Sequence, residues 1–360
     1  MGLRSDVAVV VVGAGQAGLA TAYELMRGGL RPQEDFVLVD ARDPDTLAWR
    51  QRWDSLRLFT PAWYSHLPGV PMPGDPNRHP LAHEVGEYLD AYRESLGVQP
   101  RWGVRALGVT VEPQGLVLRT TGEDIRASAI IAATGPFSLP SYPLFAESVV
   151  VAGATLHSDQ YRRPSQMPGG PVLVVGSGNT GLQIARELAA THCVSIARGS
   201  RQLRLPQRFL GLDIFRWLKL TGALTVPATS LLGRRMSRTE TIIGSGLGSL
   251  AASGVHVLPR AVGASGDVVS FEGGEERHFD SIIWATGYRT GYEWLPRQAL
   301  ADRTALRDGG TAVDGIYLIG APWMRNRASA LIGGVGADAE RVVAAVRRQL
   351  GDAGKIGSAR

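Results

Sequence analysis

Two glycine-rich turns carry the clearest chemistry in this sequence. They are Gly13-Ala14-Gly15-Gln16-Ala17-Gly18 and Gly176-Ser177-Gly178-Asn179-Thr180-Gly181. A turn of this form between a strand and a helix lets the backbone approach a pyrophosphate, which the amides and the positive dipole end of the helix attract. Two such turns in one chain predict two dinucleotides that exchange electrons with each other.

The residues that close the two nucleotide units differ in charge. Asp40 ends the strand after the first turn, where a carboxylate accepts hydrogen bonds from ribose hydroxyls and repels a 2′-phosphate. Arg198 takes the corresponding place after the second turn, with Ser200 and Arg201 close behind, and a guanidinium suits a 2′-phosphate. The pattern predicts FAD or NAD at the first site and NADPH rather than NADH at the second. A solvated surface arginine is the alternative interpretation of Arg198.

A single cysteine, Cys193, limits where the electrons can go next. One cysteine can form neither an intrachain disulfide, nor a redox dithiol, nor a zinc cluster. We therefore predict no metal site, and the sequence disfavours a thioredoxin-reductase-like enzyme, which requires a Cys-x-x-Cys pair. A chain that needs no disulfide fits a reducing cytoplasm.

The elements that position the turns repeat the same order. In each unit an apolar strand precedes the turn, and a helix and a second strand follow it; the predicted elements are 7–12, 16–28 and 36–40, and then 172–175, 182–190 and 194–198. We therefore predict an α/β fold of two Rossmann-like dinucleotide-binding domains, the second inserted in the first. The prolines and glycines of 164–171 suggest a linker, so the predicted segments are 1–163, 164–288 and 289–360.

Three further stretches have weaker signals. The corners Ala133-Thr134-Gly135 and Ala285-Thr286-Gly287 each follow an apolar run, which predicts close backbone approaches where the chain crosses between domains. Residues 53–83, with six prolines, predict a long ordered loop. Residues 203–235 have apolar residues at near-helical spacing, which predicts a helical excursion packed on its own domain or on a dimer partner; a lid or substrate channel is the alternative.

Charge and hydropathy constrain the partners. The formal net charge of +5 suits a phosphate-rich cofactor, and the basic residues are spread along the chain, so we expect no nucleic acid partner. No stretch approaches the 18 apolar residues of a membrane span, so we expect no membrane partner. The aromatic stripe at 209–220 makes a homodimer plausible.

The sequence as a whole resembles the flavin-containing monooxygenases, the class B flavoprotein oxygenases, and most of all their short bacterial subgroup. The family identifier, FxGxxxHxxxY or F, is matched by Gly153, His157 and Tyr161, with Val151 in place of the phenylalanine. Related Baeyer–Villiger oxygenases carry Trp at the position of Tyr161, so oxygenation of nitrogen or sulfur is favoured. The segment 49–61 and the Ala-Thr-Gly-Tyr corner are also similar.

The resemblance implies a pyridine-nucleotide-disulfide-oxidoreductase-like fold with FAD in the first site and NADPH in the second, although some members also accept NADH. The residues expected to hold FAD are Gly13, Gly15, Gln16, Gly18, Asp40, Trp49 and Arg50, and those expected to hold NADP are Gly176, Gly178, Asn179, Thr180, Gly181 and Arg198, with Arg201 nearby. His157 is the expected catalytic group, supported by Tyr161, and Thr60 is expected to contact the flavin. A structural link under the NADP domain is the alternative for His157.

The implied reaction consumes NADPH and O2, forms a flavin C4a-(hydro)peroxide, and transfers one oxygen atom to a sulfide or amine of a small molecule. One departure bears on this chemistry. Many family members have an Asn near the position of Thr60 or Pro61, and this chain lacks it. An NADPH oxidase or reductase that releases peroxide therefore stays open. Baeyer–Villiger oxygenation of small ketones and a flavin-bound redox sensor without turnover stay open as well.

Overall fold

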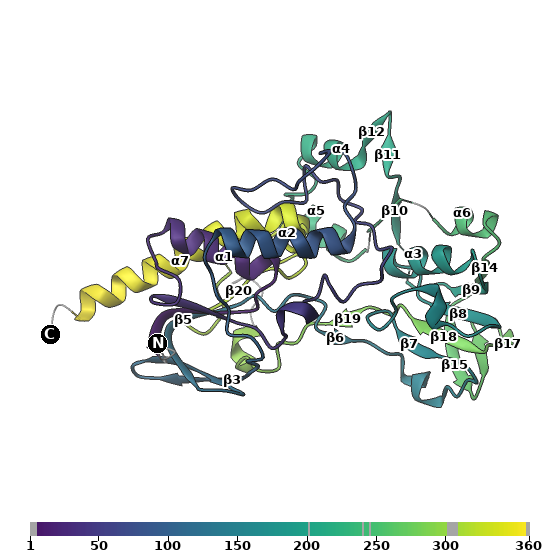
Figure 1. The fold of residues 1–360 in the computed structure, drawn as a ribbon, viewed down its shortest axis with the longest axis horizontal. Coiled ribbons are helices and arrows are strands. Elements are labelled where there is room, and N and C mark those ends of the chain that lie inside the picture. Colours follow the sequence, from purple (N-terminus) through teal and green to yellow (C-terminus); the bar gives the residue numbers. More distant parts are fainter. Residues whose placement is uncertain (1–5, 201, 240, 245, 301–308, 358–360) are drawn as a thin grey trace.

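The computed structural model describes residues 6–200, 202–239, 241–244, 246–300 and 309–357. Figure 1 shows an α/β unit at each end of the molecule, and both the first strand and the last helix belong to the same unit. The chain therefore leaves the first unit, builds the second and returns, as an inserted domain requires.

The first unit is built on a sheet of order β2-β1-β5-β4-β3, with β20 also paired to β5. Its strands are β1 (Asp6–Val12), β2 (Phe36–Val39), β3 (Ala106–Glu112), β4 (Gly115–Thr120), β5 (Ile125–Ala132) and β20 (Ile316–Leu318). After the exposed Asp6, strand β1 is apolar because its side chains enter two cores. Val9 and Val11 pack toward α1 (Gln16–Arg27), α2 (Ala82–Ser95) and α7 (Ile332–Gly357), and Val10 and Val12 face the opposite side.

The second unit is a five-stranded parallel sheet of order β14-β9-β8-β18-β7. Its strands are β7 (Thr155–His157), β8 (Pro171–Val175), β9 (Cys193–Ala197), β14 (His256–Leu258) and β18 (Ser281–Trp284). Helices α3 (Asn179–Leu188) and α6 (Leu247–Ala252) cover one face. The antiparallel strands β15 (Ala261–Ser265), β16 (Val268–Phe271) and β17 (Glu276–His278) form a separate small sheet, and β15 and β16 help to cover the other face.

A two-stranded ribbon carries the chain between the units. Strand β6 (Leu139–Pro140) runs outward beside the returning β19 (Tyr288–Arg289), and the two are antiparallel. The first crossing therefore lies near residue 140, and the boundary predicted at 163/164 differs from the structure. Strand β7 already belongs to the second sheet, because it hydrogen-bonds to β18. Prolines 164–171 form a turn inside the second unit, not a linker.

Residues 203–238, here called the excursion, leave the second unit after β9. They form β10 (Leu203–Leu205), β11 (Arg208–Phe209), β12 (Leu212–Asp213), α4 (Ile214–Leu220) and α5 (Leu231–Ser237), after which β13 (Thr241–Ile243) pairs with β10. The prediction of a helical excursion packed on its own domain is therefore wrong in large part. A short hairpin precedes α4, and Phe215 of α4 packs against Phe59 and Tyr64 of the first unit.

The remaining predictions of secondary structure agree with the structure to within a few residues. Residues 53–81 contain no helix, as expected of the proline-rich loop. Helix α3 begins at Asn179 rather than Leu182. Short 3₁₀ turns complete the described elements at Pro44–Thr46, Leu144–Ser148, Pro164–Gln166, Arg297–Leu300 and Arg327–Ala330.

The β11–β12 hairpin has an unusual residue at its tip. Leu210 and Gly211 form the two-residue turn, and both have positive φ, 49° and 79°. Such a turn favours Asn-Gly, because a branched apolar side chain is strained in this region. We expect Leu210→Asn to raise the free energy of unfolding by about 1 kcal/mol. Chemical denaturation of the two proteins measures this, and an unchanged or lower stability would contradict it.

Candidate functional site

The first glycine turn is closed by backbone contacts that only glycine allows. The Gly13 amide donates to the Val39 carbonyl at 2.7 Å, and its φ is +112°. A Cβ on Gly13 would lie 2.4 Å from the Ala133 carbonyl oxygen, and one on Gly18 would lie 1.8 Å from that of Gly13. A Cβ on Gly15 would meet nothing within 4 Å. The turn is thus packed on its protein side and open at Gly15.

The open side of this turn has the chemistry of an anion site. Helix α1 begins there without a side-chain cap and without an acid in its first turn. Its first amides are therefore available to a phosphate. Asp40 stands at the end of β2, where its carboxylate accepts hydrogen bonds from the amides of Ala14 and Arg42, at 2.8 and 2.9 Å. Each carboxylate oxygen keeps a lone pair for a ribose hydroxyl.

The flanking residues predicted for the first site lie in two groups. The Trp49 indole donates to the Gln16 side chain at 2.9 Å, and Gln16 donates to the Ala330 carbonyl at 3.1 Å. These contacts hold Gln16 at the start of α1. Arg50 is instead ion-paired with Asp90 on α2.

The second glycine turn repeats the first in detail. The Gly176 amide donates to the Ala197 carbonyl at 3.1 Å with φ +108°, and its Cβ would lie 2.4 Å from the Ala285 carbonyl oxygen. A Cβ on Gly181 would lie 1.9 Å from the Gly176 carbonyl oxygen. Helix α3 also begins with neither a side-chain cap nor an acid. The predicted close approach of both Ala-Thr-Gly corners is therefore confirmed, because each crosses the first glycine of one turn.

The residues around the second turn leave a guanidinium open to solvent. Arg198 follows β9 and is exposed, and no described residue pairs with its side chain. The neighbouring Ser177 hydroxyl accepts from the Gly199 amide at 3.0 Å, and the Asn179 side chain accepts from the Ile243 amide at 3.3 Å. Thr180 is half-buried beside it. Arg201 lies outside the described residues.

His157 joins β7 to the second Ala-Thr-Gly corner. The imidazole is buried, with Nδ1 2.8 Å from the Asp159 carboxylate and Nε2 3.1 Å from the Gly287 carbonyl oxygen. The backbone amide of Asp159 also lies 3.3 Å from Nδ1, so contacts with Asp159 and Gly287 fix the orientation of the ring. Its centroid lies 4.9 Å from that of Tyr288. His157 therefore sits where the returning chain leaves the second unit.

The other two predicted catalytic residues have partners of their own. Tyr161 is fully buried and donates its hydroxyl to Glu187 at 2.9 Å. Burial and this carboxylate raise the pKa of Tyr161 far above its usual value, so it remains a neutral donor. Thr60 is also buried, and its hydroxyl accepts from Ser65 at 2.7 Å. Direct roles for these residues stay predictions.

An arginine that the sequence did not single out crosses the ribbon between the units. The Arg52 guanidinium lies over the rings of Phe137 and Tyr288, at 5.5 and 5.3 Å, and donates to the Tyr288 hydroxyl at 2.8 Å. Phe137 is on the outgoing chain and Tyr288 on the returning one. Arg52 thus fixes the two crossings together by cation–π contacts.

Asp213 fastens the excursion to the first unit. It lies 3.0 Å from His79 and accepts from Gln207 at 2.9 Å, and Gln207 also donates to the Phe59 carbonyl at 3.0 Å. Burial by itself would raise the pKa of Asp213. Hydrogen bonds from His79, the Phe215 backbone and Gln207 outweigh burial and lower this pKa below its usual value.

We expect Asp213→Asn to destabilise the protein in a pH-dependent way. A lowered folded-state pKa means that the carboxylate contributes fully above the unfolded-state pKa of about 3.9 and less as the pH falls through the folded-state value. The variant should lose about 1 kcal/mol at neutral pH, because the pair is partly screened. Urea unfolding at neutral and acidic pH measures this. An equal deficit at both would show that the charge of Asp213 is unimportant.

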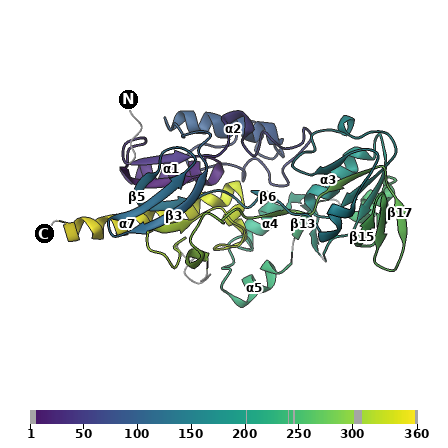
Figure 2. The same cartoon turned by 90° about the horizontal axis from the view of Figure 1, so that it is seen from below.

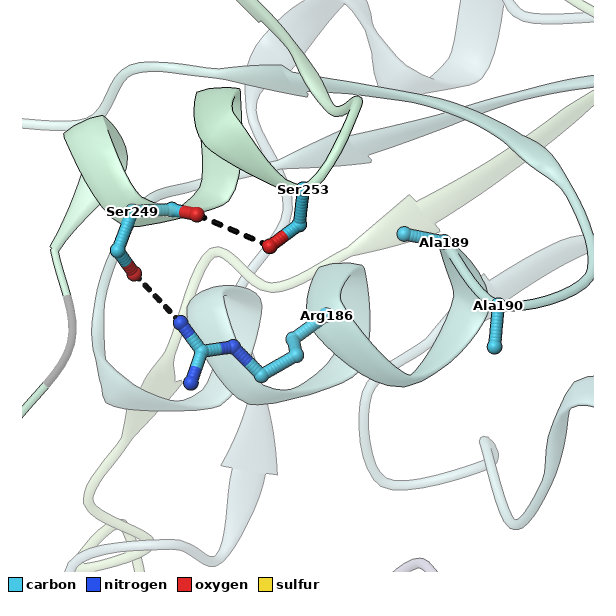
Figure 3. Close-up of a pocket in the computed structure, with 5 residues that line it drawn as sticks. All are labelled: Arg186, Ala189, Ala190, Ser249 and Ser253. Atoms are coloured by element: carbon cyan, nitrogen blue, oxygen red, sulfur yellow. Dashed lines mark hydrogen bonds between the residues drawn. The ribbon is translucent and has the colours of Figure 1, made fainter.

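A surface hollow of about 560 Å³ lies away from both glycine turns. Figure 3 shows it between α3 and α6, lined by Arg186, Ala189, Ala190, Ser249 and Ser253. Arg186 donates to Ser249 across it at 2.6 Å. The hollow contains none of the predicted site residues, so it offers no alternative to the two turns.

A family model described as pyridine nucleotide-disulphide oxidoreductase matches residues 10–204, more than half of the chain. The chain belongs to this family. The match includes both glycine turns. Because the chain has one cysteine, an exposed one, this member of the family has no dithiol of its own.

Relatives within the family agree with the predicted resemblance. An uncharacterized oxidoreductase CzcO-like protein of Geobacillus kaustophilus is 37% identical over 95% of this chain and 98% of its own. The indole-3-pyruvate monooxygenase YUCCA1 of Oryza sativa subsp. japonica is 31% identical over 79% of this chain and 78% of its own. The flavin-containing monooxygenase structure from Stenotrophomonas maltophilia has 28% identity and a TM-score of 0.77, covering 97% and 100%. The resemblance to flavin-containing monooxygenases and the predicted fold are confirmed, and the chain is an oxidoreductase.

Proposed function

We propose that this family member is an FAD-dependent, NADPH-consuming monooxygenase that transfers one oxygen atom of O2 to a sulfide or amine of a small molecule. The observation that carries the proposal is the repeated turn. Two uncapped helix N-termini, each beside a glycine turn crossed by an Ala-Thr-Gly corner, lie on either side of one short ribbon. The flavin-containing monooxygenase and indole-3-pyruvate monooxygenase among the similar proteins support this activity.

The residues around the first turn fit FAD. Open space at Gly15 admits a pyrophosphate, and Asp40 suits an unphosphorylated ribose. Trp49 and Gln16 support each other beside the start of α1. Arg50 would contribute through the Asp90 pair that holds the 49–50 segment on α2.

The residues around the second turn fit NADPH. The amides of Asn179 and Thr180 begin α3, and they are available to an anion because the first turn has neither a side-chain cap nor an acid. Arg198 is exposed where a 2′-phosphate would lie in such a unit, and its fork geometry suits that group. NADH could bind the same turn with less affinity, because it lacks this phosphate.

When bound, the two cofactors supply hydride transfer and the activation of O2. The chain's own part is to align them and exclude water. His157 holds the returning chain through Gly287, and Arg52 holds both crossings, so these residues fix how the two units face each other. Tyr161 would position the α3 side of the second unit through Glu187. We propose a cytoplasmic location, since the lone cysteine requires no oxidising compartment.

One observation favours a second candidate, an NADPH oxidase that releases peroxide. The chain lacks the asparagine that many family members have near the position of Thr60 or Pro61, and the Thr60 hydroxyl accepts a hydrogen bond from Ser65. A hydroxyl has one donor where a side-chain amide has two, so Thr60 can donate fewer hydrogen bonds to an oxygenated site than the asparagine could.

Stopped-flow absorbance tests the two candidates. The enzyme is reduced anaerobically with one equivalent of NADPH and mixed with oxygenated buffer. A near-ultraviolet band that lasts for seconds before oxidised flavin returns would support the monooxygenase, and sulfides, amines and ketones would then be tested as substrates. Direct return of oxidised flavin with stoichiometric peroxide would support the oxidase. Bound FAD with no NADPH consumption would favour a redox sensor.

A further inference from the structure

The excursion carries a concentrated positive charge, whereas basic and acidic residues nearly balance in the rest of the chain. Residues 203–238 are one tenth of the sequence, yet they hold seven arginines and lysines and a single acid, Asp213. Their formal net charge is +6, whereas the whole chain carries +5. Basic residues are spread along the chain, but in this segment they outnumber the acids seven to one. Arg208, Arg234, Arg235 and Arg238 are exposed, and no described acid forms an ion pair with them.

The same segment exposes an unusual share of apolar side chains. Seven of the sixteen large apolar residues that are exposed among the described residues lie in it: Leu203, Phe209, Leu210, Leu212, Leu220, Leu231 and Leu232. Figure 1 shows the β11–β12 hairpin at the edge of the molecule, and Figure 2 shows α5 projecting outward. Exposed apolar side chains that lie among basic residues are typical of interaction surfaces.

The hairpin tip presents its apolar side chain rigidly. Leu210 is 75% exposed at a turn position whose φ of 49° favours Asn or Gly. The hairpin beneath it is anchored, since the Trp217 indole donates to the Phe209 carbonyl at 2.9 Å and the two rings make an edge contact. Neither the fold nor solubility gains from a leucine here. A partner that takes up an apolar side chain explains its presence.

Helix α5 presents a second mixed surface. Gly233 is buried, and a Cβ there would lie 2.0 Å from the Pro227 carbonyl oxygen, so this side of α5 packs inward. Leu231, 87% exposed, and Arg234 and Arg235 lie on the solvent side. Elements that lie in a lipid interface typically combine exposed apolar side chains with arginines, whose long apolar stems can also contact the lipid.

We infer that the excursion docks the protein on the surface of an anionic lipid bilayer, with Leu210 and α5 at the headgroup level. None of the described helices is long and apolar enough to cross a membrane. The expectation of no membrane partner rested on that criterion alone, and a peripheral contact needs no spanning segment. Basic residues near the surface add attraction that falls with ionic strength.

Two other occupants fit the surface less well. A second copy that met this face across a two-fold axis would oppose its +6 charge with the same charge. A nucleic acid would satisfy the arginines, but it would leave the exposed leucines against phosphates. A bilayer accommodates both kinds of side chain at once.

Vesicle sedimentation with the full-length, FAD-loaded protein tests the inference. We expect binding to vesicles of phosphatidylcholine mixed with phosphatidylglycerol, weaker binding as salt rises, and little binding to phosphatidylcholine alone. Leu210→Asn should reduce binding about tenfold. It should also be more stable than the parent and leave NADPH oxidation unchanged, so misfolding cannot explain the loss. A triple Arg234→Ser, Arg235→Ser and Arg238→Ser variant should bind less and depend less on salt.

The matched control is Leu144→Asn, which removes a fully exposed leucine outside the excursion. It should bind vesicles like the parent. Equal losses for Leu144→Asn and Leu210→Asn, or equal binding to neutral and anionic vesicles, would overturn the inference. So would DNA binding in place of vesicle binding, or a dimer in light scattering that Leu210→Asn dissociates. Because vesicle binding, DNA binding and light scattering do not require turnover, these results are independent of the proposed activity.

Discussion

The Gly15→Ala variant should fold about as well as the parent without cofactor, yet lose most of its affinity for FAD. The added methyl meets no protein atom within 4 Å, and the backbone at Gly15 has φ −78°, which alanine adopts freely. Alanine is a slightly poorer helix cap than glycine, but it also loses less chain entropy on folding, so the two effects nearly cancel. The methyl would, however, occupy the open side of the turn, where a pyrophosphate must approach the backbone.

Forcing a methyl group into a filled site is destabilising by about 1–3 kcal/mol, which corresponds to about a tenfold to hundredfold weaker binding. Fluorescence titration of the apoprotein with FAD measures the dissociation constant, and thermal denaturation of the apoprotein measures the fold. Gly108→Ala is the matched control, because it also adds a methyl in open space within the first unit, on β3. It should change neither quantity by much.

Gly18→Ala separates packing from binding at the same turn. Its methyl would lie 1.8 Å from the Gly13 carbonyl oxygen, so the apoprotein itself should be destabilised. If Gly15→Ala retained FAD like the parent, the first turn would not be the FAD site. If the Gly15→Ala apoprotein were destabilised like Gly18→Ala, the conclusion that a methyl group has open space at Gly15 would be wrong.

The features that the sequence revealed are those with short-range patterns. A strand, a glycine turn and a helix follow one another within thirty residues, and the acid or arginine after the next strand completes each unit. The Ala-Thr-Gly corners could also be predicted, because they repeat the same form in the same order. Their contacts proved to be the 2.4 Å approaches that require glycine at Gly13 and Gly176.

The features that could not be predicted from the sequence depend on contacts between residues that are far apart in the chain. Arg52 and Tyr288 are separated by 236 positions, and neither local sequence indicates that the two side chains are in contact. The same holds for His79 and Asp213, which fasten the excursion to the first unit. The apolar spacing within 203–235 predicted a helical excursion, but a hairpin followed by a short helix produces similar spacing. Strand β7 was missed because three residues are too few for a periodic signal.

Arg198→Ala should reduce kcat/KM for NADPH about tenfold and leave that for NADH nearly unchanged. A guanidinium that contacts a phosphate contributes about 1.5–3 kcal/mol, and the exposure of Arg198 places the effect at the lower end. Since the 2′-phosphate is the only group that distinguishes the two cofactors, the loss should fall on KM for NADPH. It should shrink as ionic strength rises, because an exposed pair is screened.

The control for charge alone is Arg186→Ala, which removes an exposed arginine of the same unit that lies in the hollow between α3 and α6 (Figure 3). Its effect on both cofactors should be small. Steady-state oxidation of NADPH and NADH by the parent and both variants gives the comparison. If Arg198→Ala lowered kcat/KM equally for the two cofactors, Arg198 would support the fold of the second turn and would not bind the 2′-phosphate. Equal losses in both variants would mean that the net charge of the unit, and no particular arginine, attracts NADPH.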